Sequence, residues 1–574
     1  MIAELLASYG TLPDIWGEGA LFAFSGIDGE TQSRSGFVLT FGPRMFSLLI
    51  HTPARRVVDI RLVQPGVVRA ATSDLLMVDT PAGELVLAFA AWHTLVGALP
   101  TGAQAALQFE DTPVPGGDVG EYWVSDDAEH GDALVMLTRQ GRFVLAYGRT
   151  AEEAENRAET GLFRDLKRVV DERLAFYEKL PRLLFPAKDR LLKKCASVMK
   201  VNTLSAEGEM NQPWSTPDRV PHQHMWLWDS VFHTFGMNPI RPRLAWDYLK
   251  SVLDFQRPDG MIPHCMQVDG RVSRISQPPL LAWGVWENYH SLHDRSTLEY
   301  ALPRLEQYLN WDLTQRDQNG NRLLEWFIEG DVRCRSGESG LDNSPRFDEA
   351  ILLDAVDFST FAALDLYALA QIAGMLGQPE KAAHWQPQAE QVSRQVHALL
   401  WDEVAGFYFD RRMDGTLSDV RAVTGFLPLL LPDLPAGRAQ RLAAALADPQ
   451  DFGTAFPVPS VAVSHPQFST DMWRGATWIN LNYLIIHGLQ QRGLTSEARS
   501  LRAKTLAMVD NYYRKSGVLF EYFDSTDQRP PQACDRKGAR VEPYDIRRKM
   551  DSIRDYHWTA ALTARLLLEE AGIV

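Results

Sequence analysis

Cysteine is scarce in this sequence. Its 574 residues include four cysteines, Cys195, Cys265, Cys334 and Cys534, and no two of them form a CxxC pair. Four widely spaced thiols are too few to staple a chain of this length, so we expect free cysteines in a reducing compartment. The same spacing predicts no metal site built from the cysteines.

Long basic and long apolar runs are also absent. The formal net charge is −15, and no cluster of lysine and arginine forms the basic stripe that a nucleic-acid partner requires. A neutral substrate suits this charge better than a polyanion. No apolar run approaches about 20 residues, and the opening MIAELL lacks the cationic and apolar regions of a signal peptide. We therefore expect a cytoplasmic protein with no membrane partner.

The composition that remains is that of a folded protein of more than one domain. Hydrophobic residues make up 45% of the chain and charged residues 23%, and 574 residues exceed what one ordinary core accommodates. Residues 1–150 contain short apolar or alternating runs broken by glycine, proline and aspartate, for example 37–41, 57–62 and 143–147. This spacing predicts an N-terminal antiparallel β-sandwich.

Helical patterns dominate the rest of the chain. Residues 151–185 are rich in Glu, Ala, Arg, Lys and Leu and end near two prolines, which indicates a helical linker. Residues 186–574 contain twelve candidate helices separated by loops rich in Trp, Gly, Pro and Asp. We expect an all-α (α/α)6 toroid, with loops that converge on one cleft. The alternative is a helical repeat array, but no fixed period of 33 to 47 residues is visible.

Two carboxylates stand out as a candidate acid and base. Asp342 lies among turn formers, Ser-Gly before it and Asn-Ser-Pro after it, which would hold its carboxyl on a rigid loop. Alternatively, Asp342 only caps that turn. Glu521 lies in the aromatic run VLFEYF, where an ordinary surface carboxylate would be poorly solvated. Alternatively, Glu521 points outward from an alternating strand.

Three further segments carry side chains suited to sugar recognition. Trp226 and Trp228 could stack on a sugar ring and Asp229 could accept hydroxyl hydrogen bonds, or the three could be two core indoles and a helix cap. Gln277 precedes two prolines, so its amide is either fixed toward a hydroxyl or part of a simple turn. Arg474 could hold a substrate hydroxyl or one of the acids, or form a buried structural ion pair.

These segments occur in an order that resembles glycoside hydrolase family 63, within the clan of (α/α)6-barrel inverting α-glycosidases. The resemblance covers about residues 185–574 and rests on six stretches: 225–230, 256–264, 276–279, 338–346, 472–478 and 520–524. It implies that Asp342 is the general acid and Glu521 the general base. It also implies that substrate is bound by Trp226, Trp228, Asp229, His264, Gln277, Trp473, Arg474 and Gly475. Close relatives often carry Tyr where this chain has His222.

The resulting expectation is an inverting, exo-acting α-glycosidase, an α-glucosidase acting on a small or oligomeric carbohydrate without any cofactor. The two carboxyl groups of such an enzyme lie about 6.5–9.5 Å apart, and the acid needs a raised pKa while the base stays ionised. An inverting glycoside phosphorylase and a non-catalytic carbohydrate-binding or sensing protein are the alternatives.

Three weaker sets of candidate site residues remain in the sequence. Asp331, Glu338 and Asp348 flank Asp342 and could serve as the acid instead. Residues 317–325 place oxygen-bearing side chains around a glycine, as a Ca²⁺ loop does, but a solvated turn is favoured because the loop lacks the length and acidity of an EF-hand. The His-Gln-His at 222–224 lacks the partners of a zinc site.

Overall fold

The protein was analysed as a computed structural model that describes residues 6, 8–35, 37–109, 122–331, 334–350, 352–538 and 551–574. The chain forms two compact units. The first comprises Met1–Gln223, Asp510–Leu519 and Arg554–Ala560, and the second comprises His224–Val509, Phe520–Ile553 and Ala561–Val574. The sequence boundaries at 150 and 185 stay predictions.

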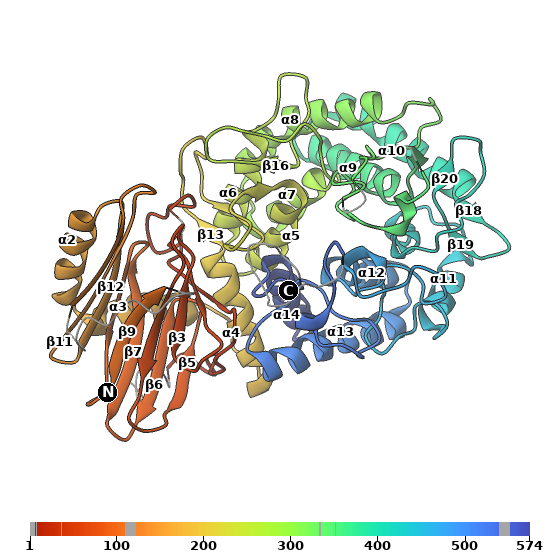
Figure 1. Ribbon diagram of the computed structural model, residues 1–574. Coiled ribbons are helices and arrows are strands. Elements are labelled where there is room, and N and C mark those ends of the chain that lie inside the picture. Colours follow the sequence, from red (N-terminus) through yellow and green to blue (C-terminus); the bar gives the residue numbers. More distant parts are fainter. Residues whose placement is uncertain are drawn as a thin grey trace. The chain divides into compact units, whose positions relative to one another are not determined.

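Two antiparallel sheets make up most of the first unit (Figure 1). One sheet has the order β1, β2, β3, β4, β9, and the other has the order β10, β11, β12, β8, β7, β6, β5. The strands are β1 Leu21–Phe22, β2 Leu39–Phe41, β3 Ser47–Ile50, β4 Arg56–Arg61, β5 Val67–Ala71, β6 Leu75–Thr80, β7 Gly83–Ala91, β8 Thr94–Ala98, β9 Gln104–Phe109, β10 Tyr122–Asp127, β11 Asp132–Arg139 and β12 Arg142–Gly148.

Helices cover the seven-stranded sheet. Helix α2 (Ala151–Leu162) contacts β11 and β12, and α3 (Leu166–Glu178) contacts β7. This cover explains why β11 and β12 read as almost continuous apolar runs, since both of their faces are buried. The segment 151–185 is therefore helical, as predicted, and it packs on the β-sheet of its own unit. Helix α4 (Pro186–Val201) and the short strands β13 (Thr203–Leu204) and β14 (Trp214–Ser215) complete the unit.

The second unit is a ring of helices (Figure 1). Its helices are α5 Leu227–Met237, α6 Pro242–Leu253, α7 Leu281–Leu292, α8 Arg295–Gln315, α9 Val356–Met375, α10 Pro379–Leu399, α11 Arg438–Ala447 and α12 Ile479–Gln491. Helices α13 (Thr495–Ser516) and α14 (His557–Glu570) belong to this unit over part of their length.

Contacts between these helices describe two concentric layers. Helices α5, α7, α9, the 3₁₀ helix η2 (Val423–Leu430) and α12 contact one another in chain order. Outside them, α6 contacts α5 and α7, α8 contacts α7 and α9, and α10 packs on α9. The ring closes through α14, because Ala561 packs on Gly236 of α5 and Glu569 hydrogen-bonds His487 of α12. The predicted (α/α)6 toroid after an antiparallel β region is confirmed.

One of the twelve candidate helices of the sequence, the one expected at residues 418–431, differs. Residues 418–431 contain the 3₁₀ helix η2 in place of an α-helix. Pro428 lies inside this segment, and a Cβ on Gly425 would come within 2.3 Å of the ring of Phe407. The missing N–H of the proline and this close approach favour a short, tight helix over an α-helix.

Helix α9 is apolar enough, by length and composition, to cross a membrane. However, 72% of that apolar stretch is buried inside the fold. Its buried side chains include Phe358, which stacks on Trp326 at 3.7 Å. Burial of this kind is the property of a core helix, and the cluster around Trp326 and Phe358 underlies the loop that precedes α9.

Candidate active site

Asp342 lies on a tight loop between α8 and α9. The Asp342 carbonyl accepts the backbone N–H groups of Arg335 at 2.8 Å and Ser336 at 3.2 Å, and the Ser344 N–H donates to the carbonyl of Leu341 at 2.9 Å. The turn-forming residues around Asp342 thus fix its backbone from both sides. This is the rigid placement predicted from the sequence.

Gly340 lets this loop rest directly on Trp228. The φ of Gly340 is +73°, and a Cβ at this position would lie 2.3 Å from Cζ2 of the Trp228 ring. Trp228 is buried, and its backbone N–H donates to Oε1 of Gln277 at 3.1 Å. Trp228 and Gln277 therefore support the loop and the start of α5, and the sugar contacts assigned to them stay predictions.

The Asp342 carboxylate is paired with a lysine that the sequence reading did not single out. Nζ of Lys537 lies 2.7 Å from Oδ2 of Asp342. Burial by itself raises the pKa of Asp342, but attraction to Lys537, assisted by His264 and Arg536, outweighs burial and holds the pKa below its ordinary value. The sequence-based expectation is a raised pKa for the general acid. For Asp342 paired with Lys537 this prediction is wrong, because the pKa is lowered.

Glu521 lies in an extended segment that is closed off from solvent. Its backbone N–H donates to the carbonyl of Ile553 at 2.8 Å, and its side chain is almost fully buried. Nη2 of Arg536 lies 3.1 Å from Oε1 of Glu521, and both side chains are at most 4% exposed. The alternative of an outward-pointing strand glutamate is wrong, because this carboxylate is buried and ion-paired.

Two consecutive residues therefore hold the two candidate carboxylates. Arg536 pairs with Glu521, and Lys537 pairs with Asp342. In the sequence these cations are only two basic residues about 15 positions after Glu521, and no pattern marks them. This loop thus contacts both Asp342 and Glu521, which are 179 residues apart in the chain.

Asp471 anchors the loop that carries these cations. Its carboxylate accepts the backbone N–H of Lys537 at 2.7 Å and of Gly538 at 2.8 Å. The same carboxylate accepts Nδ2 of Asn343 at 3.0 Å. Asp471 thus links the cationic loop to the neighbour of Asp342, so both sides of the candidate site share one support.

Arg474 contacts the loop of Asp342 through Asp348 and Asn343. Its guanidinium forms two hydrogen bonds with Asp348, at 3.1 and 2.6 Å, and donates to the carbonyl of Asn343 at 2.9 Å. Next to it, the Trp473 N–H donates to Oδ1 of Asn343 at 3.1 Å. The short 3₁₀ helix η3 (Met472–Arg474) therefore holds the loop after Asp342 at two points, Asn343 and Asp348.

Trp473 and Gly475 complete this support. The Trp473 ring stacks on Trp478 at 3.7 Å and is buried. The Gly475 N–H donates to Oγ of Ser460 at 2.8 Å, and a Cβ on Gly475 would lie 2.4 Å from the carbonyl oxygen of Ser469. These contacts account for an indole and a glycine at these positions, and direct contact with substrate stays a prediction for both.

His264 lies near Asp342, and Trp226 contacts His264. Their rings meet edge to face at 4.7 Å, and the charge of Asp342 reaches the His264 ring. Burial lowers the pKa of His264 to about 4, so its imidazole is neutral at pH 7. Within the described residues Nδ1 of His264 is buried without a hydrogen-bond partner. A neutral imidazole can donate to or accept from a sugar hydroxyl.

The other acids near these segments differ in burial and in their partners, and the substrate contact expected of Asp229 stays a prediction. Asp229 is buried in the first turn of α5. Glu338 is fully buried and forms a bidentate ion pair with Arg316, at 2.9 and 2.8 Å. Asp348 is committed to Arg474, and Asp331 is exposed. Their contacts favour Asp342 over these three alternatives as the acid.

The candidate metal loop is held by hydrogen bonds. Asn319 and Asn321 each direct an amide N–H group toward the Asp354 carboxylate, at 2.8 Å, and Arg411 pairs with the same carboxylate at 3.1 Å. Three donors around Asp354 suit a solvated turn better than a Ca²⁺ site. Across the part of the chain that the structure describes, no group of three or more His, Cys, Asp or Glu side chains is placed to hold a metal ion.

His222 belongs to the first unit. It hydrogen-bonds Asp218 and contacts the ring of Tyr556 edge to face.

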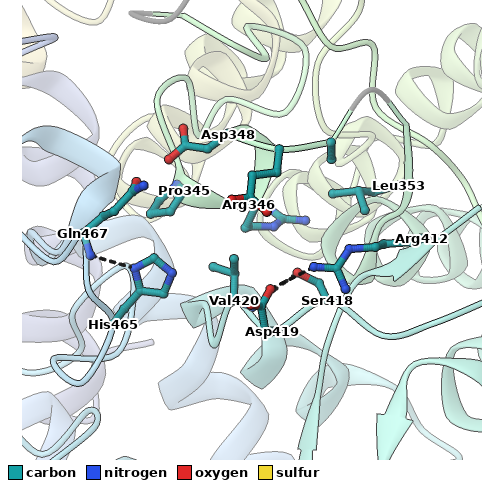
Figure 2. Close-up of a pocket in the computed structure, with 12 residues that line it drawn as sticks. Pro345, Arg346, Asp348, Leu353, Arg412, Ser418, Asp419, Val420, His465 and Gln467 are labelled. Carbon is teal, nitrogen blue, oxygen red and sulfur yellow. Dashed lines mark hydrogen bonds and ion pairs between the residues drawn. The ribbon is translucent and has the colours of Figure 1, made fainter.

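A small pocket adjoins the Asp348 side of the loop. Figure 2 shows it between Arg346 and Asp348 on one side and His465, Gln467 and Asp419 on the other. Its volume is about 80 Å³, which accommodates only a few water molecules and is far below the roughly 300 Å³ of a typical small-molecule site. Neither Asp342 nor Glu521 lines this pocket, so it is separate from the two carboxylates.

Comparison with known proteins identifies the family. Residues 222–559 match the family described as the mannosylglycerate hydrolase MGH1-like glycoside hydrolase domain. A mannosylglycerate hydrolase from Thermus thermophilus is 27% identical over 396 residues, which is 54% of this chain and 91% of that protein.

Solved structures agree on the fold. A family 63 mannosylglycerate hydrolase from Thermus thermophilus in complex with glucose matches with a TM-score of 0.54 and 25% identity, over 65% of this chain and 99% of the other. A bacterial glucoamylase complexed with acarbose matches with a TM-score of 0.58, over 98% of this chain and 97% of the other, and its 11% identity shows the fold alone. With more than half of its length in the matched domain, the chain is a glycoside hydrolase and belongs to glycoside hydrolase family 63.

Proposed function

We propose that this family 63 glycosidase is an inverting, exo-acting α-glycosidase in which Asp342 is the general acid and Glu521 the general base. One observation carries the proposal: two carboxylates from distant loops are held by Lys537 and Arg536, consecutive residues of a third loop. Inverting glycosidases use two carboxyl groups in separate roles.

Each carboxyl group would make one proton transfer. Asp342 gives its proton to the glycosidic oxygen as the bond to the anomeric carbon breaks, and Glu521 takes a proton from the water that attacks this carbon from the opposite face of the ring. An α-glycoside then yields a β-sugar and an alcohol. His264, neutral and beside Asp342, would hold a sugar hydroxyl.

The same contacts disfavour a phosphorylase. That reaction needs free positive charge for a phosphate nucleophile on the side of the proposed base, but Arg536 there is buried and neutralised by Glu521. A buried glutamate is moreover suited to activating water, whereas phosphate needs no base. We therefore retain hydrolysis as the reaction.

The proposed substrate is a small α-glucoside or α-mannoside. The names of the relatives support a small substrate, because mannosylglycerate consists of one sugar joined to one short acid. Glucose is the sugar expected from the sequence, and the related structure in complex with glucose supports a site that accepts this ring.

The test is a screen of α-glucosides and α-mannosides, including glycosylglycerates, with NMR detection of the first anomer released. We expect the β-anomer from an α-glycoside. Asp342→Asn and Glu521→Gln should each lower kcat by several orders of magnitude, since either change removes one proton transfer. Matched controls are Asp419→Asn and Glu403→Gln, whose side chains are 86% and 80% exposed.

Four results would contradict the proposal. Release of the α-anomer would exclude inversion. Phosphate-dependent release of a sugar phosphate would indicate the phosphorylase. Near-full activity of either variant would show that the substituted residue is not the acid or base assigned to it. Carbohydrate binding without turnover of any α-glycoside would indicate the non-catalytic alternative.

A further inference from the structure

Lys537 is paired with the carboxyl group from which Asp342 would have to donate its proton. Its ammonium lies 2.7 Å from the Asp342 carboxylate, and the two side chains remain 35% and 22% exposed. A partly exposed pair of this kind can be reached by a ligand. A carboxylate in close contact with an ammonium favours its ionised form, whereas a general acid must begin the reaction protonated.

The pair must therefore change before Asp342 can donate a proton. One way is for Lys537 to take a different anionic partner when substrate binds. The proton of Asp342 goes to the glycosidic oxygen, so the aglycone carbon that carries this oxygen comes to lie beside Lys537. A carboxylate attached to that carbon would meet the ammonium directly.

We propose that Lys537 is a specificity-determining residue that exchanges Asp342 for a carboxylate on the aglycone, at the carbon bearing the glycosidic oxygen. This inference deepens the proposed function and rests on it. The exchange has two effects: the substrate anion gains an ammonium partner, and Asp342 loses its counter-charge while a second negative charge approaches. Both changes favour protonation of Asp342 at the moment its proton is needed.

The surrounding contacts leave Lys537 free to make this exchange. Its backbone is fixed, since Asp471 accepts the N–H groups of Lys537 and Gly538, and the Tyr522 hydroxyl donates to the Asp535 carbonyl at 2.7 Å. Its four-carbon stem can nevertheless rotate, so the ammonium can turn toward a ligand without movement of the loop.

The neighbours of Asp342 are less suited to meet the substrate anion. Arg536 is committed to Glu521 in a buried pair. His264 is neutral at pH 7 because burial lowers its pKa to about 4. The Cys334 thiol is also neutral, since burial raises its pKa to about 12. Among the residues that the structure describes, Lys537 is thus the positive group paired with Asp342 and is not engaged by the proposed base.

The first test compares two substrates that differ only in this group, an α-glycosylglycerate and the matching α-glycosylglycerol. We expect the native enzyme to have the higher kcat/KM on the glycerate, by about 10- to 100-fold, the range of one hydrogen bond to a charged group. Lys537→Met should collapse this ratio, and Lys537→Arg should retain much of it. Lys381→Met is the control, because it removes an ion-paired lysine between α8 and α10, helices without candidate site residues.

The second test measures binding of D-glycerate by calorimetry and does not depend on turnover. Asp342→Asn frees Lys537 from its partner, so this variant should bind D-glycerate more tightly than the native enzyme. Lys537→Met should bind it more weakly, and the double variant should not regain affinity. Thermal unfolding checks that each variant is folded.

The outcomes separate the two proposals. If the enzyme hydrolyses both glycosides with β-anomer release but Lys537→Met leaves their ratio unchanged, the exchange is overturned and the proposed function stands. Equal D-glycerate affinity in all variants also overturns the exchange. If no α-glycoside is hydrolysed, the proposed function fails and the exchange fails with it.

Discussion

The Arg474 guanidinium donates two hydrogen bonds to the Asp348 carboxylate and a third to the carbonyl of Asn343. Asn343 directly follows Asp342, and Asp348 ends the same turn. Arg474 therefore ties the two ends of the segment after the candidate acid without touching the acid itself. This geometry makes it a positioning residue for the Asp342 loop.

Arg474→Ala is expected to lower kcat by about 100-fold with a smaller effect on KM, because a misplacement of the acid by about 1 Å has a cost of this size. Asp348→Asn, which keeps the shape but removes the charge, should give a weaker loss in the same direction. Steady-state kinetics on one α-glycoside measures both. An increase in KM with unchanged kcat would instead show that Arg474 holds substrate.

Gly340→Ala is expected to lower activity and to destabilise the protein by about 1–3 kcal/mol, the cost of forcing extra volume into a packed site. The new methyl group would overlap the Trp228 ring, and φ is positive as well. Gly320→Ala is a matched control with a φ of +71° and no atom within 4 Å of the new Cβ. Similar losses in both variants would assign the effect to backbone strain alone.

Arg346→Met is expected to destabilise the protein by about 3–5 kcal/mol, because it leaves two buried carboxylates without their shared cation. Arg346 is fully buried and forms bidentate contacts with both Asp357 and Asp410. Denaturant unfolding would measure the loss. Arg441→Met removes a pair with Glu403 that is largely exposed, so it should change stability by less than about 1 kcal/mol.

Acidification from about pH 6.5 to pH 4 is expected to remove the stability that four buried, neutral histidines contribute. Burial lowers the pKa of His93, His264 and His397 to about 4 and that of His557 to about 3. At these four histidines the unfolded chain binds more protons than the folded chain below about pH 6.5, so the stability that they contribute is lost as pH falls through this window.

The contribution of one histidine can be isolated at His557. The variant His557→Asn keeps a donor for the Thr216 carbonyl but cannot be protonated in this range. Its melting temperature should decline less steeply with acidification than that of the native protein. An equal slope would show that His557 contributes nothing to the pH dependence.

Local patterns predicted much of this fold. Alternating apolar runs indicated the antiparallel strands, helical periodicity indicated the ring of helices, and the turn residues around Asp342 indicated a fixed loop. The 3₁₀ helix η2 was predicted as an α-helix, because the periodicity of a short apolar segment does not distinguish the two. Gly425 and Pro428 were the residues in the sequence that disfavoured an α-helix there.

The electrostatics of the candidate site were not predictable in the same way. The pairing of Lys537 with Asp342 joins residues 195 positions apart, and the pairing of Arg474 with Asp348 joins residues 126 positions apart. Such contacts depend on how loops meet above the ring of helices. For that reason the sequence indicated a carboxyl at Asp342 but gave the wrong direction for its pKa.

The adjacency of Arg536 and Lys537 makes the two carboxylates mechanically interdependent. Their Cα atoms are held about 3.8 Å apart by a single peptide unit, so a displacement of this loop shifts both counter-ions together. Loss or gain of one residue here would put the wrong cation, or none, opposite each acid. Insertions and deletions in this loop are therefore constrained, even at positions where the residue type is free to change.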